Sequence, residues 1–313
     1  MSVPSRVIIA TRESALALCQ ARYIRARLIT LYPSLEVELL GVTTQGDRLL
    51  SSSLSKVGGK GLFVKELENA LEEGHADIAV HSMKDVPVLL PPGFAITVAG
   101  EREDPRDAFV SNKYANLSSL PAGAKVGTSS LRREAQLRAR HPHVAVVPLR
   151  GNVQTRLLKL DQGQYSAIIL AAAGLKRLGL ASRITATLEP EDSLPAAGQG
   201  ALAVECRESR TDLIEMVAPL CDPETQWCVR AERSVSRALS GSCVMPIGAL
   251  ALRVETGWSV RGFVASPDGK RYVAAEEWTS DLSADPEAVG QALAHRLLAD
   301  GAREILDSLP HDQ

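Results

Sequence analysis

An apolar strand pattern that ends abruptly in charge occupies the stretch Asp77-Ile-Ala-Val-His-Ser-Met-Lys-Asp-Val-Pro87. In open α/β sheets, ligands bind beyond the carboxyl ends of the strands, so we expect Lys84 and Asp85 to face a cleft. Pro87 stops the strand because proline has no backbone N–H to donate to a neighbouring strand. On its own, such a Lys-Asp pair is more often a surface ion pair. Similar charges at other predicted strand ends favour a binding site instead.

Strand and helix patterns alternate through the chain before about residue 200, which predicts parallel sheets with crossover helices. The first unit is a strand at 6–11, a helix at 14–31 and a strand at 36–42. A polar, glycine-bearing stretch at 43–61 then interrupts the alternation, and a helix at 62–73 follows it. Because so long a loop is uncommon inside a compact domain, it is typical of a functional lid or of disorder.

Two segments are predicted to cross between the lobes of a clamshell. One is the charged, proline-broken run at 100–107, and the other is the proline- and glycine-bearing run at 193–200. After residue 220 the pattern changes to a helix, three antiparallel strands and a last helix bent near Gly301. Ser266-Pro-Asp-Gly269 is typical of a hairpin turn between two of these strands. The predicted division is lobe 1 at 1–100 and 201–219, lobe 2 at 101–200, and a C-terminal α+β domain at 220–313.

Composition excludes several classes of protein. The chain has 313 residues, is 45% hydrophobic and 23% charged, and carries a formal net charge of -2. No apolar run is long enough for a signal peptide or a membrane span, so we expect a soluble protein of the cytoplasm. With 4% aromatic residues and no net basicity, a nucleic-acid surface is not expected. The five cysteines are widely spaced without a Cys-x-x-Cys motif, so neither a disulfide framework nor a metal site is predicted.

Cationic side chains recur where predicted strands give way to helices. Arg132 and Arg133 fall in the first turn of a helix predicted at 131–140, where the helix dipole disfavours cations. An anion held by the helix amides and both guanidiniums would explain their position. Taken singly, each cation is more often a solvated surface residue. Together they predict a cleft for a small ligand with several carboxylates or phosphates. The other cations of this kind are Arg12, Arg150, Arg156, Lys176 and Arg177.

Three further features were weighed against plainer interpretations. The glycine-rich run at 57–63 is not a phosphate-binding loop, because Lys60 is followed by Gly61 instead of serine or threonine. Cys243 lies among small residues on a predicted corner, where a thiol is accessible, although a buried structural cysteine is slightly favoured when it is taken alone. His81 at the end of a strand is more often a hydrogen-bonded structural group than a general base.

These motifs closely resemble the hydroxymethylbilane synthases, also called porphobilinogen deaminases, of tetrapyrrole biosynthesis. The resemblance covers nearly the whole chain, with the motifs in order and at compatible spacing. They are Ala10-Thr-Arg-Glu-Ser14, Lys56-Val-Gly-Gly-Lys-Gly-Leu-Phe-Val-Lys-Glu-Leu67, His81-Ser-Met-Lys-Asp-Val-Pro87, Glu101-Arg-Glu-Asp-Pro-Arg-Asp-Ala-Phe109, Val126-Gly-Thr-Ser-Ser-Leu-Arg-Arg133, Leu149-Arg-Gly-Asn-Val153 and Cys243-Val-Met-Pro-Ile-Gly248.

The resemblance implies a fold, a reaction and a cofactor. The fold is two lobes like type II periplasmic binding proteins with two crossovers, plus the C-terminal α+β domain with a three-stranded antiparallel sheet. Cys243 would hold a dipyrromethane cofactor through a thioether. Four porphobilinogen molecules would be joined to it head to tail with loss of ammonia, and hydroxymethylbilane would be released. The resemblance also implies a monomer that passes its product to uroporphyrinogen III synthase.

Roles of single residues follow from the same resemblance. Asp85 would be the catalytic acid and base, and it would also contact the cofactor. The other cofactor-binding residues would be Ser14, Lys84, Ser130, Arg132, Arg133, Arg150 and Arg156. Substrate would be bound by Arg12, Arg150, Arg156 and Arg177, and a mobile loop would include Lys56, Lys60 and Phe63.

Some positions depart from the most familiar pattern of the family. Ser242 stands where a second glycine commonly precedes the cysteine, Glu13 where glutamine is common, and Thr44-Gln45 where a basic residue is frequent. From the residues alone, the alternative is a two-lobed anion-binding receptor or sensor without covalent chemistry. Asp85 among the cations and the Cys243 corner favour the enzyme, whereas Arg132, Arg133 and Arg150 fit both functions.

Overall fold

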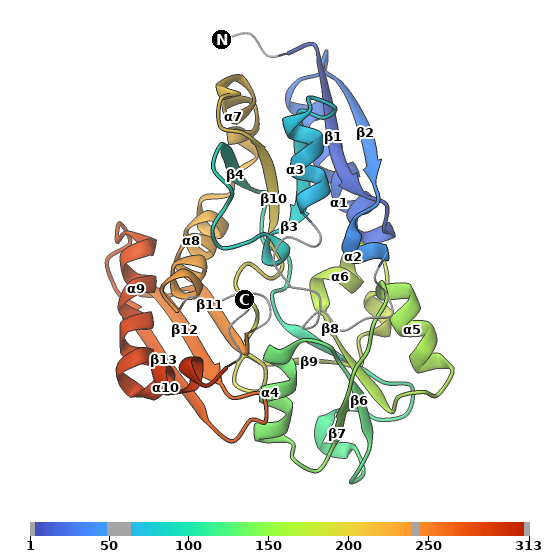
Figure 1. The fold of residues 1–313 in the computed structure, drawn as a ribbon, viewed down its shortest axis with the longest axis vertical. Coiled ribbons are helices and arrows are strands. Elements are labelled where there is room, and N and C mark those ends of the chain that lie inside the picture. The colour runs from blue at the N-terminus through green and yellow to red at the C-terminus, as the bar shows by residue number, and fades with distance from the viewer. Residues whose placement is uncertain (1–3, 49–63, 240–244, 310–313) are drawn as a thin grey trace.

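The computed structural model describes residues 4–48, 64–239 and 245–309, which form three sheets and the helices around them (Figure 1). Two five-stranded sheets make up the two lobes, and a three-stranded sheet makes up the C-terminal domain. In Figure 1, lobe 1 lies at the top, lobe 2 at the lower right and the C-terminal domain at the lower left. The predicted fold class, two α/β lobes and a C-terminal α+β domain, is confirmed.

The sheet of lobe 1 is covered on both faces. In spatial order its strands are β2 (Glu36–Val42), β1 (Arg6–Arg12), β3 (Ile78–Ser82), β10 (Leu202–Arg207) and β4 (Phe94–Ala99). Side chains alternate along a strand, so Val7 and Ile9 face helices α1 (Ala15–Leu31) and α7 (Thr211–Val217). Ala10 faces α3 (Lys65–Glu72) on the other side. Short helical segments of this lobe are α2 (Gln45–Arg48), η2 (Met83–Asp85) and η5 (Ala218–Leu220).

Lobe 2 repeats this layered arrangement. Its strands, in spatial order, are β7 (Ala145–Val147), β6 (Lys125–Gly127), β8 (Ala167–Ala171), β5 (Asp107–Val110) and β9 (Ala186–Leu188). Helix α4 (Leu131–Arg140) packs on one face, where Leu137 meets Phe109 and Val126. Helices α5 (Val153–Asp161) and α6 (Ala172–Arg177) cover the other face. Two further turns of helix are η3 (Leu117–Ser119) and η4 (Ala181–Arg183).

Both large sheets are mixed, so the prediction of parallel sheets was wrong for one strand in each. β10 runs antiparallel to β3 and β4, and β5 runs antiparallel to β8 and β9. Each of these two strands begins directly after a crossover between the lobes. Each strand therefore enters its sheet from the edge that faces the other lobe, and it is antiparallel to the neighbouring strands because they end at that edge. Strands β4, β5 and β9 also escaped the sequence analysis.

The C-terminal domain packs two helices on an antiparallel sheet. Its elements are α8 (Pro223–Ala238), β11 (Ile247–Val254), β12 (Gly257–Ala265), β13 (Tyr272–Thr279), α9 (Pro286–Leu297), a π-helical turn (Leu298–Ala302) and α10 (Arg303–Asp307). Gly301 has a φ of 105°, which favours glycine, so the predicted bend in the last helix is confirmed. The rings of Trp227 and Trp258 stack with centroids 4.0 Å apart.

A buried ion pair joins the first crossover to the C-terminal domain. Arg102 donates to both carboxylate oxygens of Glu232 in α8, at 2.6 and 3.0 Å. Glu232 also accepts from the backbone N–H groups of Gly198, in the second crossover, and Ala251, in β11. One carboxylate therefore connects both crossovers to the third domain. Our division into 1–100 with 201–219, 101–200 and 220–313 remains a proposal, which the pairing of β10 in the first sheet supports.

Candidate active site

The end of β3 places Asp85 beside the start of α1. β3 runs into the helical turn η2, where Lys84 is partly buried and Asp85 is exposed. Asp85 lines a small cavity together with Arg12, which ends β1, and Ser14. The Ser14 hydroxyl caps α1 by accepting a hydrogen bond from the Ala17 N–H at 3.3 Å. Other residues that line this cavity are Leu16, Ala17, Gln20, Val64, Val80, His81 and Ser82.

Cations of lobe 2 lie close enough to this strand end to act on it electrostatically. Burial, and then the charge of Arg133, lower the pKa of Lys84 to about 8, while Asp85 opposes the shift. Burial, and then Arg133 and Arg150, lower the pKa of Arg156 to about 10, and Asp85 again opposes the shift. Lys84 and Arg156 thus lie within electrostatic reach of both Asp85 and Arg133.

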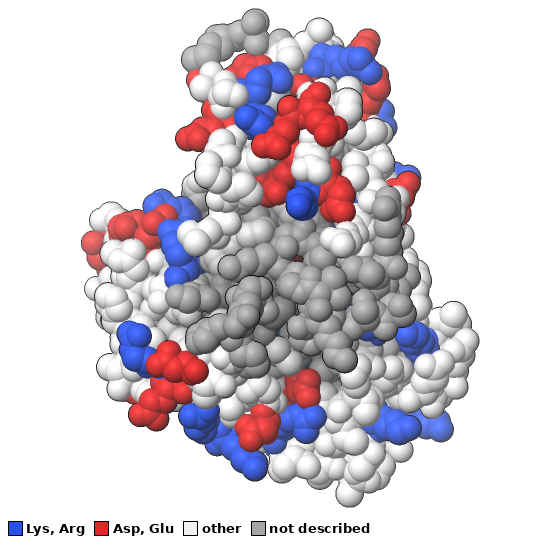
Figure 2. Space-filling model, in the orientation of Figure 1, with Lys and Arg blue, Asp and Glu red and all other residues white. Residues whose placement is uncertain are grey.

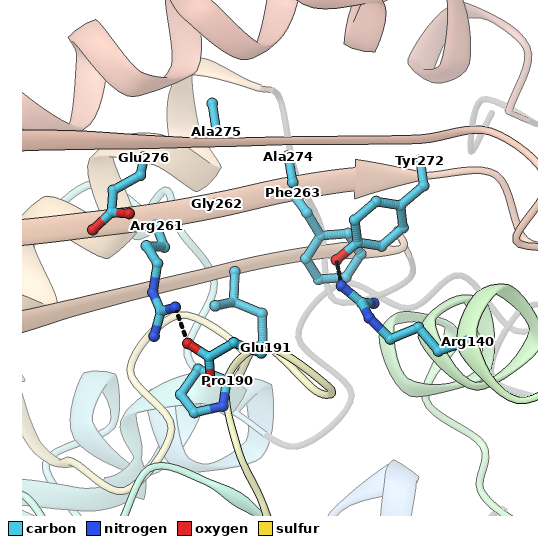
Figure 3. Close-up of a pocket in the computed structure, with 11 residues that line it drawn as sticks. Arg140, Pro190, Glu191, Arg261, Gly262, Phe263, Tyr272, Ala274, Ala275 and Glu276 are labelled. Atoms are coloured by element: carbon cyan, nitrogen blue, oxygen red, sulfur yellow. Dashed lines mark hydrogen bonds and ion pairs between the residues drawn. The ribbon is translucent and has the colours of Figure 1, made fainter.

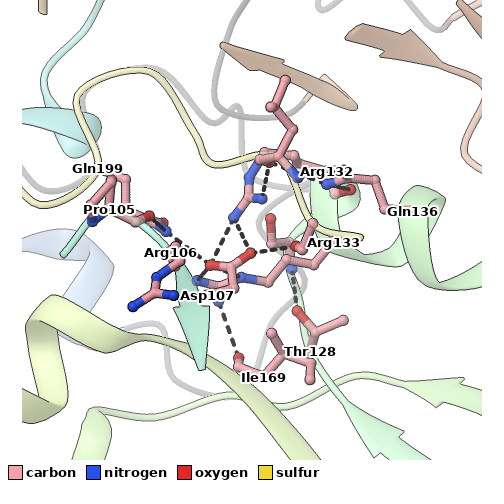
Figure 4. A network of polar contacts seen from close by, with 12 residues as sticks. Pro105, Arg106, Asp107, Thr128, Arg132, Arg133, Gln136, Ile169 and Gln199 are labelled. Carbon is pink, nitrogen blue, oxygen red and sulfur yellow. Dashed lines mark hydrogen bonds and ion pairs between the residues drawn. The ribbon is translucent and has the colours of Figure 1, made fainter. Parts of the chain in front are cut away.

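Arg132 and Arg133 are buried around an internal carboxylate, Asp107 (Figure 4). Arg132 Nη2 lies 2.9 Å from Asp107 Oδ2, and Arg133 Nη2 lies 2.7 Å from Oδ1. Ser193 donates to Oδ2 at 2.7 Å and Gln199 to Oδ1 at 2.9 Å. Burial by itself would raise the pKa of Asp107, but the two guanidiniums outweigh burial and hold the pKa well below its usual range. Asp107 is thus ionised and holds both arginines in place.

This counterion corrects part of the sequence argument. The sequence predicts an anion beside Arg132 and Arg133 in the first turn of α4, and the structure shows that Asp107 at the start of β5 supplies an internal one. Two guanidiniums share one carboxylate, so the cluster keeps a net positive charge. Sequence reasoning missed Asp107 because nothing local relates it to helix α4, although it lies within the quoted run at 101–109.

Gln199 was also missed, and it connects the two halves of the site. Lys84 Nζ lies 3.3 Å from Gln199 Oε1, while Gln199 Nε2 donates to Asp107 Oδ1 and to the Pro105 carbonyl. Gln199 is 1% exposed and belongs to the second crossover. A chain of hydrogen bonds therefore runs from Lys84 of lobe 1 to the arginine cluster of lobe 2.

The remaining predicted arginines belong to lobe 2. Arg156 Nε donates to the Gly151 carbonyl at 2.7 Å, and burial lowers the pKa of Arg150. Arg177 Nη2 donates to the Gly200 carbonyl at 2.7 Å, so it contacts the second crossover. Ser130 precedes α4, and its side chain makes no capping hydrogen bond. Its hydroxyl is thus not committed to the end of its own helix.

His81 is a buried partner of a glutamate, in line with the structural interpretation. Its Nε2 lies 2.9 Å from Glu205 Oε2 across the β3–β10 pair, and both side chains are almost fully buried. Glu68 in α3 lies near this pair. Burial, and then the charge of Glu205, raise the pKa of Glu68 to about 7.

A second groove, of about 310 Å³, lies between lobe 2 and the C-terminal sheet (Figure 3). Arg140 donates to the Tyr272 hydroxyl at 3.0 Å, and Arg261 pairs with Glu191 across it. It shares no lining residue with the cavity beside Asp85. Figure 2 shows acidic and basic side chains interspersed over the viewed face, with acidic ones gathered over α3. Convergent cations beside a carboxylate are found at the strand ends of the two lobes.

Comparison with known proteins assigns the family. A sequence model described as porphobilinogen deaminase, dipyromethane cofactor binding domain, matches residues 7–215. A second, described as porphobilinogen deaminase, C-terminal domain, matches residues 226–299. The chain belongs to the porphobilinogen deaminase family. The resemblance read from the motifs is thereby confirmed, and an anion receptor without covalent chemistry is not favoured.

Curated relatives of the porphobilinogen deaminase family match along the full chain. The porphobilinogen deaminase of Thiobacillus denitrificans is 64% identical over 302 residues, covering 96% of this chain and 98% of that protein. That of Methylobacillus flagellatus is 60% identical over 312 residues, covering 100% of both. Among solved structures, the periplasmic VFT2 domain of Bordetella pertussis BvgS matches with a TM-score of 0.42 and 18% identity, over 68% of this chain and 86% of that one.

Several residues that the porphobilinogen deaminase resemblance singles out lie outside the described residues. They are Lys56, Lys60, Phe63, Ser242 and Cys243. The four described cysteines are free. Burial raises the pKa of Cys206 to about 11 and that of Cys228 to about 12, so neither is a thiolate at neutral pH.

Across residues 4–48, 64–239 and 245–309, no group of three or more His, Cys, Asp or Glu side chains is arranged to hold a metal ion. No helix in these ranges combines the length and apolar character that crossing a bilayer requires.

Proposed function

We propose that this porphobilinogen deaminase joins four porphobilinogen molecules head to tail, with loss of ammonia at each step, on a dipyrromethane primer attached to Cys243 through a thioether. Hydrolysis then releases hydroxymethylbilane. The observation that supports the proposal most directly is the position of Asp85, an exposed carboxylate at the end of β3 among Lys84, Arg133 and Arg156. That arrangement provides one acid among several cations.

The cations match the chemistry of the ligand. Each pyrrole ring brings an acetate and a propionate group, so a growing chain requires many positive charges. Planar guanidinium groups bind carboxylates through two parallel hydrogen bonds. Bound carboxylates also reduce the electrostatic repulsion between the clustered cations. We assign cofactor binding to Ser14, Lys84, Asp85, Ser130, Arg132, Arg133, Arg150 and Arg156, and substrate binding to Arg12, Arg150, Arg156 and Arg177.

Arg132 and Arg133 are assigned to the cofactor on the basis of charge. Asp107 neutralises one of the two guanidiniums, and the buried pair retains one positive charge beside Lys84. Asp107 also fixes both side chains before any ligand arrives, which reduces the entropy lost on binding. The described residues therefore fit an anionic dipyrromethane, which when bound supplies the free pyrrole position to which the first substrate is joined.

Asp85 acts as the proton donor and acceptor in this proposal. Loss of ammonia leaves positive charge on the substrate ring, and a carboxylate within contact distance stabilises that charge. A positioned carboxyl group also transfers the protons that leave and enter the reacting atoms. Asp85 lines the same cavity as Arg12, so in this proposal it contacts the reacting end of a chain whose carboxylates are held by arginines.

Other features of the proposal concern the whole protein. We assign Lys56, Lys60 and Phe63 to a mobile loop. We also propose that the enzyme is a cytoplasmic monomer and that its product passes to uroporphyrinogen III synthase.

Intact-protein mass under denaturing conditions tests the covalent part of the proposal. The wild-type protein is expected to carry the added mass of a dipyrrole, and Cys243→Ser is expected to show the polypeptide mass alone. Cys221→Ser is the matched control, because Cys221 is a partly buried free thiol at the start of the C-terminal domain. Retention of the added mass in Cys243→Ser would move the attachment elsewhere. A wild-type protein without added mass after incubation with porphobilinogen would exclude the covalent primer.

A further inference from the structure

Arg233 of the C-terminal domain binds the backbone directly after Asp85. Its Nη1 donates to the Val86 carbonyl at 3.2 Å, and its Nη2 donates to the carbonyls of Pro87 and Val88 at 2.7 and 3.2 Å. Nη1 also lies 3.8 Å from the sulfur of Met83. Arg233 is 9% exposed, so these contacts are made away from bulk water.

From this geometry, we infer that Arg233 is a positioning residue, which fixes the Asp85 segment relative to the domain that bears the cofactor cysteine. The inference rests on the proposed role of Asp85. Between Met83 and Val88 the chain has left β3, and Pro87 has no N–H with which to join a sheet. Three consecutive carbonyls instead accept from one guanidinium. Its donors form a rigid planar fork, and charge-assisted hydrogen bonds are stronger than neutral ones.

The same helix holds the connection between the lobes. Glu232, the preceding residue of α8, binds Arg102 of the first crossover and the N–H of Gly198 in the second. Adjacent residues of α8 therefore hold the crossovers and the acid-bearing segment. In the sequence, Cys243 follows shortly after the end of α8. This arrangement holds the Asp85 segment in a fixed position relative to α8, which precedes the cysteine that would anchor the growing chain.

A positioning role and a purely structural role differ in what they change. Displacement of a catalytic group by about 1 Å can cost on the order of 100-fold in rate. The arginines assigned to substrate binding lie outside the segment that Arg233 holds, so we expect kcat to fall while KM stays unchanged. A purely structural contact affects thermal stability and the amount of folded enzyme, but it leaves kcat per loaded enzyme as it was.

The experiment compares Arg233→Met and Arg233→Lys with Ser234→Ala. Ser234 is the next residue of α8, and its hydroxyl donates to the Glu287 carbonyl at 2.8 Å, away from lobe 1. Each protein is loaded with porphobilinogen, its cofactor content is counted by intact mass, and Tm, kcat and KM are measured. We expect kcat per loaded enzyme to fall on the order of 10- to 100-fold in Arg233→Met, with unchanged KM and partial recovery in Arg233→Lys. Ser234→Ala should lower Tm and keep kcat.

Two outcomes overturn the inference. One is a wild-type kcat per loaded enzyme in Arg233→Met. The other is a loss of kcat in Ser234→Ala equal to that in the Arg233 variants at the same Tm. If Arg233→Met does not fold, Arg233→Lys decides, because one ammonium cannot reproduce the fork and an unchanged kcat then contradicts the role. Asp85→Asn is measured alongside: normal turnover there removes the proposed function, whereas an inactive Asp85→Asn with a normal Arg233→Met removes only this inference.

Discussion

Asp107 accepts two hydrogen bonds from Arg133 on one oxygen, with Oδ1 3.0 Å from Nε and 2.7 Å from Nη2. The second carboxylate oxygen, Oδ2, lies 2.9 Å from Nη2 of Arg132. All three side chains are buried at the edge of the site. The carboxylate thus offsets the repulsion between two buried guanidiniums, which also donate to the carbonyls of Leu194 and Ile169.

Asp107→Asn is expected to destabilise the protein by about 3–5 kcal/mol, because it leaves buried positive charge uncompensated. Urea unfolding measures the effect. Asp161→Asn is the control, since Asp161 pairs with Arg183 at the surface and its loss should cost about 0–1 kcal/mol. Equal losses in the two variants would show that the buried network contributes no more than an exposed pair.

The pH dependence of this difference has a definite sign. The folded-state pKa of Asp107 is lowered from its usual 3.8, so its contribution to stability is present above that value. It is lost as the pH falls through the lower folded-state pKa. The stability gap between wild type and Asp107→Asn should therefore be full at pH 7 and shrink only in strong acid.

Glu232→Gln should loosen the attachment of the C-terminal domain to both crossovers. The substitution leaves the Arg102 guanidinium, whose side chain is 10% exposed, without its counterion, and we expect a loss of about 3–5 kcal/mol. Thermal unfolding and limited proteolysis of the crossovers measure it. Glu287→Gln removes only exposed pairs with Arg230 and Arg237 and should leave both readouts near wild type. If Glu232→Gln unfolds at the wild-type temperature and its crossovers are cleaved no faster, Glu232 does not have a connecting role.

Asp85→Asn should keep the fold and the binding of carboxylates but reduce turnover by roughly 100- to 10,000-fold, the usual contribution of a positioned acid or base. Single-turnover release of ammonia by loaded enzyme is the direct measurement. Asp77 lies at the opposite end of β3, where it accepts from the Ile8 N–H and pairs with Arg210. Asp77→Asn should therefore affect stability and spare turnover. Near-normal turnover in Asp85→Asn would remove this residue from the mechanism.

Glu68→Gln should stabilise the protein in a pH-dependent way. Burial and then Glu205 raise the folded-state pKa of Glu68 to about 7 from 4.5, so the native state binds the extra proton between these values. Stability from this group is full below pH 4.5 and is lost as the pH rises through 7. Glu68→Gln should thus raise Tm at pH 8 and leave it nearly unchanged at pH 4.5. Glu72→Gln is the control, because Glu72 is exposed and its replacement should not change Tm differently at the two pH values. An equal Tm shift at pH 4.5 and pH 8 in Glu68→Gln would contradict the explanation.

The sequence located much of the site because its signals are local. Helix α4 was predicted at its observed bounds. The placement of Lys84 and Asp85 followed from an apolar run that stops in charge. Hydrophobic periodicity and helix boundaries depend on residues a few positions apart, so they can be recognised in the sequence without knowledge of tertiary contacts.

The amino-acid sequence by itself determined the alternation of strands and helices, the motifs of the family and the cations at the strand ends. Only the tertiary structure decided which polar and charged groups meet. Arg132 lies 25 positions from Asp107, His81 lies 124 from Glu205, and Arg233 lies 147 from Val86. These pairs form because the crossovers reverse one strand in each sheet and bring α8 against the end of β3. Burial then makes each pairing obligatory, since an unpaired charge away from water is too costly to keep.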